Sequence, residues 1–356
     1  MARKEFIMPT KMKAVVKAKP ELNGTEIITV DVPRPGPNDV LIKVKVASIC
    51  GTDVHIFNWD AWAAGRIKPP LLYGHEFAGH VVEVGNNVHH VKVGDYVSGE
   101  CHIACGHCLQ CRTGLAHVCQ NTKIFGVDVP GIFAEYACIP AANVWHNDPD
   151  APPEICSIQD PLGNAVHSIF ATDVVAKDVA VIGLGPIGAM CVSICKHIGA
   201  ANVFAIGRKN KYRIELAKKV GADFTFSSDD DARKAILDKT GGKGADVVLE
   251  MSGSSASIPE GLDLLRTGGE LILLGVYAEP VTLDFSKKVV FKYATIKGIN
   301  GRRMFEDWYR MKGLLKNKGI RADLEKIITH RFKFDEFQKA METMRGGNSG
   351  KVVLEL

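Results

Sequence analysis

Three residues of zinc-binding types lie in two short motifs of the first hundred positions. Cys50 opens the segment CGTDVH, and His75 and Glu76 follow Gly74 in the segment GHE. A catalytic zinc takes three such protein ligands and leaves one position open. Asp160, in the segment DPLGN, adds a carboxylate farther along the chain. By itself this set is only suggestive, because isolated histidines and cysteines are often structural.

Four further cysteines occupy one short stretch, at positions 105, 108, 111 and 119. Four thiolates close a tetrahedral zinc shell with no open position, so Cys105, Cys108, Cys111 and Cys119 predict a structural zinc. An iron–sulfur cluster uses similar cysteines, so the spacing alone does not exclude a cluster or redox-active thiols. We expect His107, inside the loop, to be a bystander and Cys101 to fall outside the ligand spacing.

A glycine-rich run occurs where an apolar segment gives way to a helical pattern. Gly183, Gly185 and Gly188, with Pro186 and Ile187 between them, form a G-x-G-x-x-G motif. The first glycine permits the turn, the second lets the backbone approach a pyrophosphate, and the third allows the helix to pack on the strand. The alternative is a tight turn that holds no ligand. The context of strand and helix favours a dinucleotide site.

The end of the following strand bears on which dinucleotide is used. An NAD site usually places an acidic residue there to accept from the ribose hydroxyls. This chain has Gly207, Arg208 and Lys209 instead. Gly207 leaves room, and Arg208 and Lys209 supply positive charge for a 2′-phosphate. We therefore expect NADP(H) to be favoured over NAD(H), the alternative being a solvated basic loop on an NAD enzyme.

The bulk composition fits a globular protein of two domains. The chain has 356 residues, 46% of them hydrophobic, and its net charge of +4 forms no basic block, so nothing indicates nucleic-acid binding. We expect no signal peptide in residues 1–16 and no membrane span, because Gly183, Gly185, Pro186 and Gly188 interrupt the apolar run 179–195. Ten cysteines without an export signal favour a reducing cytoplasm and metal binding over disulfides.

The two halves of the chain differ in their hydrophobic patterns. Up to about Ala142, short β-rich runs such as 40–47 and 80–84 are separated by turns, which predicts a β-rich unit. From about Pro161, strand-like and helical runs alternate, which predicts a parallel sheet with right-handed crossovers. We expect strands at 179–183, 202–207, 246–251, 270–276 and 351–356, and helices from 187, from 210, near 259 and over 304–316.

These motifs together resemble the zinc-containing medium-chain alcohol dehydrogenase family, and more closely its threonine dehydrogenase branch. The resemblance is carried by CGTDVHIFNWD, GHEFAGHVVEVG, GDYVSGECHIACGHCLQC, GIFAEY, DPLGNAVH, GLGPIG, MFEDWY and ITHRF, which cover nearly the whole chain. It implies an α/β fold with a GroES-like β-rich catalytic domain at 1–157 and 300–356. A structural-zinc lobe would span about 100–120, and a Rossmann domain 158–299. It also implies two zinc ions per chain, a homotetramer and a small alcohol or ketone substrate.

The resemblance also assigns roles to individual residues. Cys50, His75 and Glu76 would bind the catalytic zinc, Thr52 and His55 would relay a proton, and Asp160 would tune the site. Cofactor-contacting positions would be the glycine turn with Pro186 and Ile187, residues 207–209, Arg213, Leu274, Gly275, Val276, Ile299 and Asn300.

One departure from the resemblance concerns the cofactor and, less directly, the substrate. The threonine branch uses NAD and carries an acid where this chain has Arg208. We therefore expect a zinc-dependent secondary-alcohol dehydrogenase, threonine being the leading substrate, with NADP preference. The alternatives are an NADP-dependent butanediol, polyol or simple secondary-alcohol enzyme, and a non-catalytic NADPH-binding zinc protein.

Overall fold

A computed structural model describes residues 8–277 and 279–356. The prediction that residues 1–16 form no signal peptide includes residues 1–7, which lie outside the described residues. Within the described ranges, no helix is both long and apolar enough to cross a membrane.

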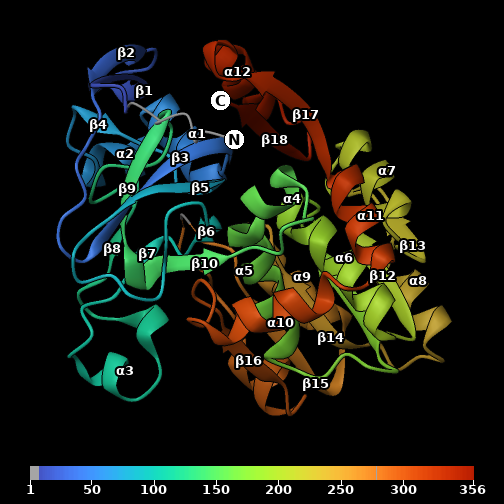
Figure 1. Ribbon diagram of the computed structural model, residues 1–356. Coiled ribbons are helices and arrows are strands. Elements are labelled where there is room, and N and C mark those ends of the chain that lie inside the picture. Colours follow the sequence, from blue (N-terminus) through green and yellow to red (C-terminus); the bar gives the residue numbers. More distant parts are fainter. Residues whose placement is uncertain (1–7, 278) are drawn as a thin grey trace.

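A seven-stranded sheet forms the body of the first unit, and it uses both ends of the chain (Figure 1). The C-terminal strand β18 (Lys351–Glu355) pairs antiparallel with β3 (Asp39–Ser48), so the last residues lie beside the N-terminal half. In spatial order the strands are β10 (Val144–His146), β6 (Tyr96–Gly99), β5 (Glu76–Val84), β3 (Asp39–Ser48), β18 (Lys351–Glu355) and β17 (Ile328–Lys333), with β9 (Tyr136–Pro140) also on β3. A second sheet contains β2 (Thr25–Asp31), β1 (Lys11–Lys17) and β4 (Leu71–Leu72), and a short ribbon pairs β7 (His102–Ile103) with β8 (Lys123–Ile124).

The second unit is a six-stranded parallel sheet, as the alternating pattern predicted. Its strands run in the order β13 (Phe224–Phe226), β12 (Asn202–Ile206), β11 (Asp178–Ile182), β14 (Ala245–Glu250), β15 (Leu265–Leu273) and β16 (Thr295–Gly298). The crossover helices are α6 (Pro186–Ile198), α7 (Lys211–Lys219), α8 (Ala232–Lys239) and α9 (Ser257–Leu264). The expected fold class, a β-rich unit with a doubly wound parallel sheet, is confirmed.

The remaining helices lie around the two sheets. They are α1 (Gly51–Asn58), α2 (Ala61–Arg66), α3 (Leu109–Arg112), α4 (Pro153–Ser157), α5 (Gln159–Phe170), α10 (Glu306–Leu314), α11 (Lys318–Ile327) and α12 (Phe337–Arg345). Each unit has a core of its own: Val181, Val203 and Leu249 lie in one, and Val44, Phe77 and Ile139 in the other. Both cores are needed, because a sheet can position a side chain only if its own packing is fixed.

Several sequence expectations require correction at this level. The strand expected at 270–276 ends at Leu273, so Leu274, Gly275 and Val276 lie in the following loop. Elements α11, β17 and α12 were not predicted from the sequence. Strand β17 lies at the end of its sheet and keeps His330 and Arg331 partly or fully exposed, so it lacks the apolar run by which a buried strand is recognised.

Candidate active site

Strand pairing brings Cys50 next to His75 and Glu76. Ser48, at the end of β3, pairs with Glu76, at the start of β5, so the residues beyond each strand end meet. Candidate ligand atoms of Cys50, His75 and Glu76 all lie within 4.8 Å of one another. Gly74 is required just before them, because its φ is +98° and a Cβ there would lie 2.4 Å from the Phe133 ring.

Buried polar atoms in this group are left without protein partners. Oε1 of Glu76 is buried and accepts no hydrogen bond within the described ranges, whereas Nδ1 of His75, also buried, lies 3.7 Å from the Asp53 carboxylate. Buried polar groups are normally satisfied, so unpaired atoms at a Cys–His–Glu cluster fit a bound cation. The residues present therefore fit a catalytic zinc.

Side chains behind the three candidate ligands fix their positions. The Asp53 carboxylate accepts from the Cys50 backbone N–H at 2.8 Å and lies 3.7 Å from Nδ1 of His75. Burial raises the pKa of Asp53 to about 6, although the nearby His75 opposes the shift. Oε2 of Glu76 accepts from the Ser48 hydroxyl and from the buried ammonium of Lys351, which β18 supplies. Second contacts of this kind orient metal ligands.

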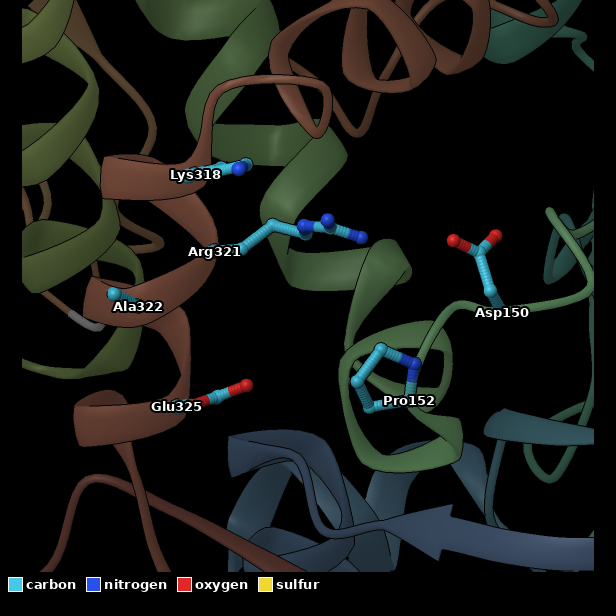
Figure 2. Close-up of a pocket in the computed structure, with 6 residues that line it drawn as sticks. All are labelled: Asp150, Pro152, Lys318, Arg321, Ala322 and Glu325. Atoms are coloured by element: carbon cyan, nitrogen blue, oxygen red, sulfur yellow. The ribbon is translucent and has the colours of Figure 1, made fainter.

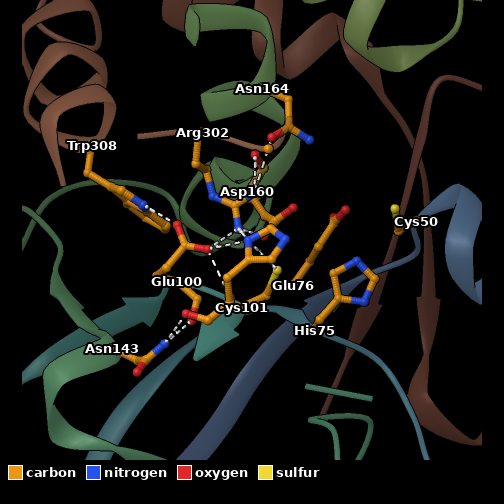
Figure 3. A network of polar contacts seen from close by, with 12 residues as sticks. Cys50, His75, Glu76, Glu100, Cys101, Asn143, Asp160, Asn164, Arg302 and Trp308 are labelled. Atoms are coloured by element: carbon orange, nitrogen blue, oxygen red, sulfur yellow. Dashed lines mark hydrogen bonds and ion pairs between the residues drawn. The ribbon is translucent and has the colours of Figure 1, made fainter. Parts of the chain in front are cut away.

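Asp160 lies near this group but has a different partner. It sits in the first turn of α5 and pairs with the guanidinium of Arg302, as Figure 3 shows. The same Nη2 atom of Arg302 lies 2.6 Å from Oε1 of Glu100, and Trp308 donates to the other oxygen of Glu100 at 2.8 Å. Burial opposes ionisation of Glu100, but Arg302 and His102 outweigh it and lower its pKa to about 2.

A second group of potential ligands was not predicted: ligand atoms of Glu100, Cys101 and His102 also lie within 4.8 Å of one another. Nη2 of Arg302 is 3.1 Å from Sγ of Cys101 and 3.4 Å from Nδ1 of His102. A protein cation therefore already holds this position. The sequence gives no sign of this contact, because Arg302 lies 202 residues from Glu100.

Thr52 and His55 lie on α1, which begins directly after Cys50. The Thr52 hydroxyl oxygen is 3.9 Å from the Cys50 sulfur. His55 pairs through Nδ1 with Asp60, and 57% of its side chain is exposed. Asp60 also caps the start of α2 through the Ala63 N–H at 3.0 Å. Sequence reasoning did not name Asp60, although its fixed carboxylate orients the imidazole.

The four lobe cysteines come together as their spacing predicted. Sγ of Cys108 is 3.5 Å from that of Cys111 and 3.7 Å from that of Cys119. Zinc–sulfur bonds of about 2.3 Å in a tetrahedron place sulfurs about 3.8 Å apart, so this cluster fits zinc. Backbone N–H groups, that of His107 first, lower the pKa of Cys105 to about 5, whereas burial raises that of Cys111 to about 12.

The glycine turn has the shape that a dinucleotide site needs. Gly183 has φ of +92°, and a Cβ on Gly188 would lie 1.9 Å from the Gly183 carbonyl oxygen. A Cβ on Gly185 would meet no atom within 4 Å, so this side of the turn is open. Pro186 begins α6, whose N-terminus can attract phosphate. Leu274–Val276 and Ile299–Asn300 follow β15 and β16 at the same edge of the sheet.

The basic residues after β12 differ in their surroundings. Arg208 is exposed and has no ion-pair partner in the described part of the chain. Lys209 pairs with Asp229 at 3.1 Å on the surface. Arg213 is partly buried, burial lowers its pKa, and its buried Nε lacks a partner. An unpaired guanidinium N–H of this kind fits an anionic ligand.

A cavity of about 320 Å³ lies elsewhere, between α11 and the loop before α4 (Figure 2). It is lined by Asp150, Pro152, Lys318, Arg321, Ala322 and Glu325. None of the predicted site residues lines it, and most of its side chains are exposed. We regard it as a solvent groove apart from the site.

Two family models match the chain over most of its length. The alcohol dehydrogenase GroES-like domain matches residues 36–149, and the zinc-binding dehydrogenase domain matches residues 186–317. The chain belongs to the zinc-binding alcohol dehydrogenase family. It is thus an oxidoreductase of the alcohol dehydrogenase type, from a family that uses NAD(P) and acts on small alcohols.

Relatives of known name support this membership. An L-threonine 3-dehydrogenase of Caldanaerobacter subterraneus subsp. tengcongensis is 54% identical over 344 residues, which cover 96% of this chain and 98% of that protein. The enzyme of the same name from Bacillus subtilis is 50% identical and covers 97% and 98%. The alcohol dehydrogenase structure from Thermotoga maritima superposes with a TM-score of 0.87 at 29% identity, covering 97% of this chain and 99% of that one.

Proposed function

We propose that the chain oxidises L-threonine to 2-amino-3-oxobutanoate and transfers hydride to a nicotinamide cofactor, with NADP⁺ preferred. The single observation that carries the substrate assignment is identity of 54% to an L-threonine 3-dehydrogenase over nearly the full length of both chains. The Cys50, His75 and Glu76 cluster supports the chemistry, because its unpaired atoms suit a metal with an open position.

We assign the metal-binding roles to the two clusters, so each chain would hold two zinc ions. Zinc bound by Cys50, His75 and Glu76 would act as a Lewis acid that favours ionisation of the alcohol. The four lobe cysteines would hold a structural ion. Asp160 would stay with Arg302 and tune the site by its charge rather than bind metal permanently.

Proton release would run along α1. The Thr52 hydroxyl accepts the alcohol proton and passes it toward His55, whose exposed ring delivers it to solvent. Asp60 holds Nδ1 of His55, which leaves Nε2 of the ring to exchange the proton. The same helix thus begins directly after a candidate metal ligand and carries the exit for the proton.

Charge around Gly207 supports the cofactor preference. Among the residues that the structure describes, Arg208 has no ion-pair partner and the buried Nε of Arg213 has no hydrogen-bond partner. No carboxylate stands at 207–209 to repel a 2′-phosphate. Lys209 contributes less, since it is shared with Asp229. We predict that Arg208→Asp weakens NADPH binding by roughly tenfold or more, as expected for a lost charge-assisted contact. Arg34→Asp, an exposed change in another part of the chain, is the control; an unchanged NADPH preference in Arg208→Asp would remove Arg208 from the assignment.

We further propose a homotetramer in the cytoplasm, with domain bounds at 157/158 and 299/300. Exposed apolar side chains gather between β15 and β16, where Phe285, Val290, Phe291 and Tyr293 are each at least 60% exposed. Exposed apolar side chains close together in a segment favour contact with another subunit. Light scattering on the purified protein measures the assembly, and a monomer at micromolar concentration would contradict it. The cytoplasmic location is proposed because the clustered cysteines suit metal binding, which a reducing compartment favours over disulfides.

A substrate panel separates the proposal from its rivals. Steady-state rates with NAD⁺ and NADP⁺ against L-threonine, 2,3-butanediol and 2-propanol should give the highest kcat/KM for threonine with NADP⁺. A higher value for butanediol, a polyol or a simple alcohol would favour the other dehydrogenases of this scaffold. The non-catalytic alternative predicts cofactor binding without turnover and one zinc per chain instead of two.

A further inference from the structure

The register of the parallel sheet places Glu250 between the two turns expected to contact the cofactor. As the last residue of β14, Glu250 pairs with Ile182 on one side and with Leu273 on the other. Ile182 precedes the glycine turn at Gly183, and Leu273 precedes the loop 274–276. The strand order changes direction between β11 and β14, and such a switch point is where dinucleotides bind in open α/β sheets.

The Glu250 side chain bonds to both neighbouring loops. Its Oε1 accepts from the Ser252 backbone N–H at 2.7 Å and from the Ser252 hydroxyl, and its Oε2 accepts from the Tyr277 hydroxyl. Glu250 is fully buried, and no cation pairs with it within residues 8–277 and 279–356. A buried carboxylate held only by neutral donors makes strong charge-assisted hydrogen bonds, so these contacts constrain the loops.

The backbones that Glu250 joins have no room to shift independently. A Cβ on Gly183 would lie 2.7 Å from the Cα of Ser252, so the 252 loop rests directly on the glycine turn. A Cβ on Gly275 would lie 2.2 Å from the Gly253 nitrogen and 2.6 Å from Oε2 of Glu250. The carbonyl of Glu250 also accepts from the Leu274 N–H at 3.1 Å. Three segments thus meet at this one residue.

We propose that Glu250 is a positioning residue for the nicotinamide cofactor: its carboxylate clamps the 252–254 and 274–277 loops against the glycine turn. The clamp sets the wall of the cofactor crevice without touching the dinucleotide. The clamp requires only that the chain bind NAD(H) or NADP(H), as its family does. Which of the two cofactors binds more tightly is a separate question that rests on the proposed function. Because each loop is held by a different oxygen, both oxygens of Glu250 must act as acceptors.

The test compares dinucleotide binding by Glu250→Gln and wild type. The amide keeps the size of the side chain but replaces one acceptor oxygen by a donor NH₂ group, which faces an N–H or O–H donor. We expect Kd for NADPH and for NADH, followed by nicotinamide fluorescence, to rise by roughly tenfold to a hundredfold. Zinc content and the KM for alcohol at saturating cofactor should stay within about twofold.

Glu260→Gln on α9 is the matched control. Glu260 is also acidic but exposed, and within the described residues its side chain bonds to none of the loop residues. It should therefore bind both dinucleotides like wild type. Tyr277→Phe removes a single donor from the partly exposed side, and we expect its Kd to rise by roughly three- to tenfold.

Two results would overturn the clamp. The first is a Kd for both dinucleotides that stays within about twofold of wild type in Glu250→Gln and in Tyr277→Phe. The second is a lower melting temperature of cofactor-free Glu250→Gln while its Kd is unchanged. If Glu250→Gln does not fold, Tyr277→Phe decides the question by itself. Failure of the proposed function is distinct, since it would appear as missing threonine turnover while the Kd shifts remain.

Discussion

Replacing Arg302 by methionine should destabilise the protein strongly, because the change leaves two buried carboxylates without their cation. Side chains of Arg302, Glu100 and Asp160 are at most 7% exposed. Breaking a buried ion pair by removing one partner costs about 3–5 kcal/mol. For 356 residues the entropy of unfolding is about 0.75 kcal/mol/K, so the melting temperature should fall by roughly 4–7 °C.

The pH dependence of stability tests the role of Arg302 a second time. With Arg302 present, the pKa of Glu100 is lowered from 4.5 to about 2. A lowered carboxyl pKa contributes stability that is fully present above about pH 4.5 and is lost as the pH falls toward 2. This contribution is about 3 kcal/mol at neutral pH. In Arg302→Met, the buried Glu100 has lost this cation and can take up a proton as the pH falls. The difference in melting temperature between wild type and variant should therefore be largest at pH 7 and should narrow toward pH 4.

Calorimetry of the metal-loaded protein measures both effects. Arg303→Met is the matched control, because Arg303 is adjacent and cationic, and its side chain pairs with exposed Glu306 at 3.1 Å. Its melting temperature should change by less than about 1 °C, since exposed pairs contribute little. A melting temperature for Arg302→Met equal to that of the control at pH 7 would refute the argument, as would a deficit that grows toward pH 4.

Three further changes test separate parts of the molecule. Cys108→Ser should remove one zinc per chain and lower the melting temperature, whereas Cys138→Ser, outside the cluster, should retain full metal content by elemental analysis. His55→Ala should lower kcat at pH 7 by roughly tenfold to a hundredfold with zinc content intact; unchanged turnover there would exclude His55 from the relay. Trp308→Phe removes the hydrogen bond to buried Glu100 and should lower the melting temperature by roughly 2–4 °C, and no change would show that this bond is dispensable.

Local motifs made much of the architecture predictable from the sequence. The lobe cysteines lie within one loop, and the glycines of the cofactor turn lie within one βα unit, so spacing alone fixes their neighbourhood. Strand pattern likewise placed β3, β11, β12 and β14 to within one or two residues. Each of these features leaves its signal within a short stretch of sequence, although the strands themselves pair over long distances.

The partners of the predicted site residues could not be read in the same way. Lys351 meets Glu76 across 275 residues, and Arg302 meets Glu100 across 202. Neither cation has a motif around it that announces a buried role, and a lysine near the C-terminus is ordinarily exposed. Only the pairing of β18 with β3 explains why Lys351 is buried beside a candidate ligand.

These two cations give the last sixty residues of the chain a part in the candidate metal site. Glu76 and Asp160 are buried carboxylates close to Cys50 and His75, and several unpaired acidic groups would repel one another in a dry interior. Lys351 supplies a positive charge to Glu76, and Arg302 supplies one to Asp160. Oε1 of Glu76 remains free while Oε2 is held, and the carboxylate can therefore turn one oxygen to a cation without losing its place. The catalytic unit thus needs both ends of the chain for its electrostatics as well as for its sheet.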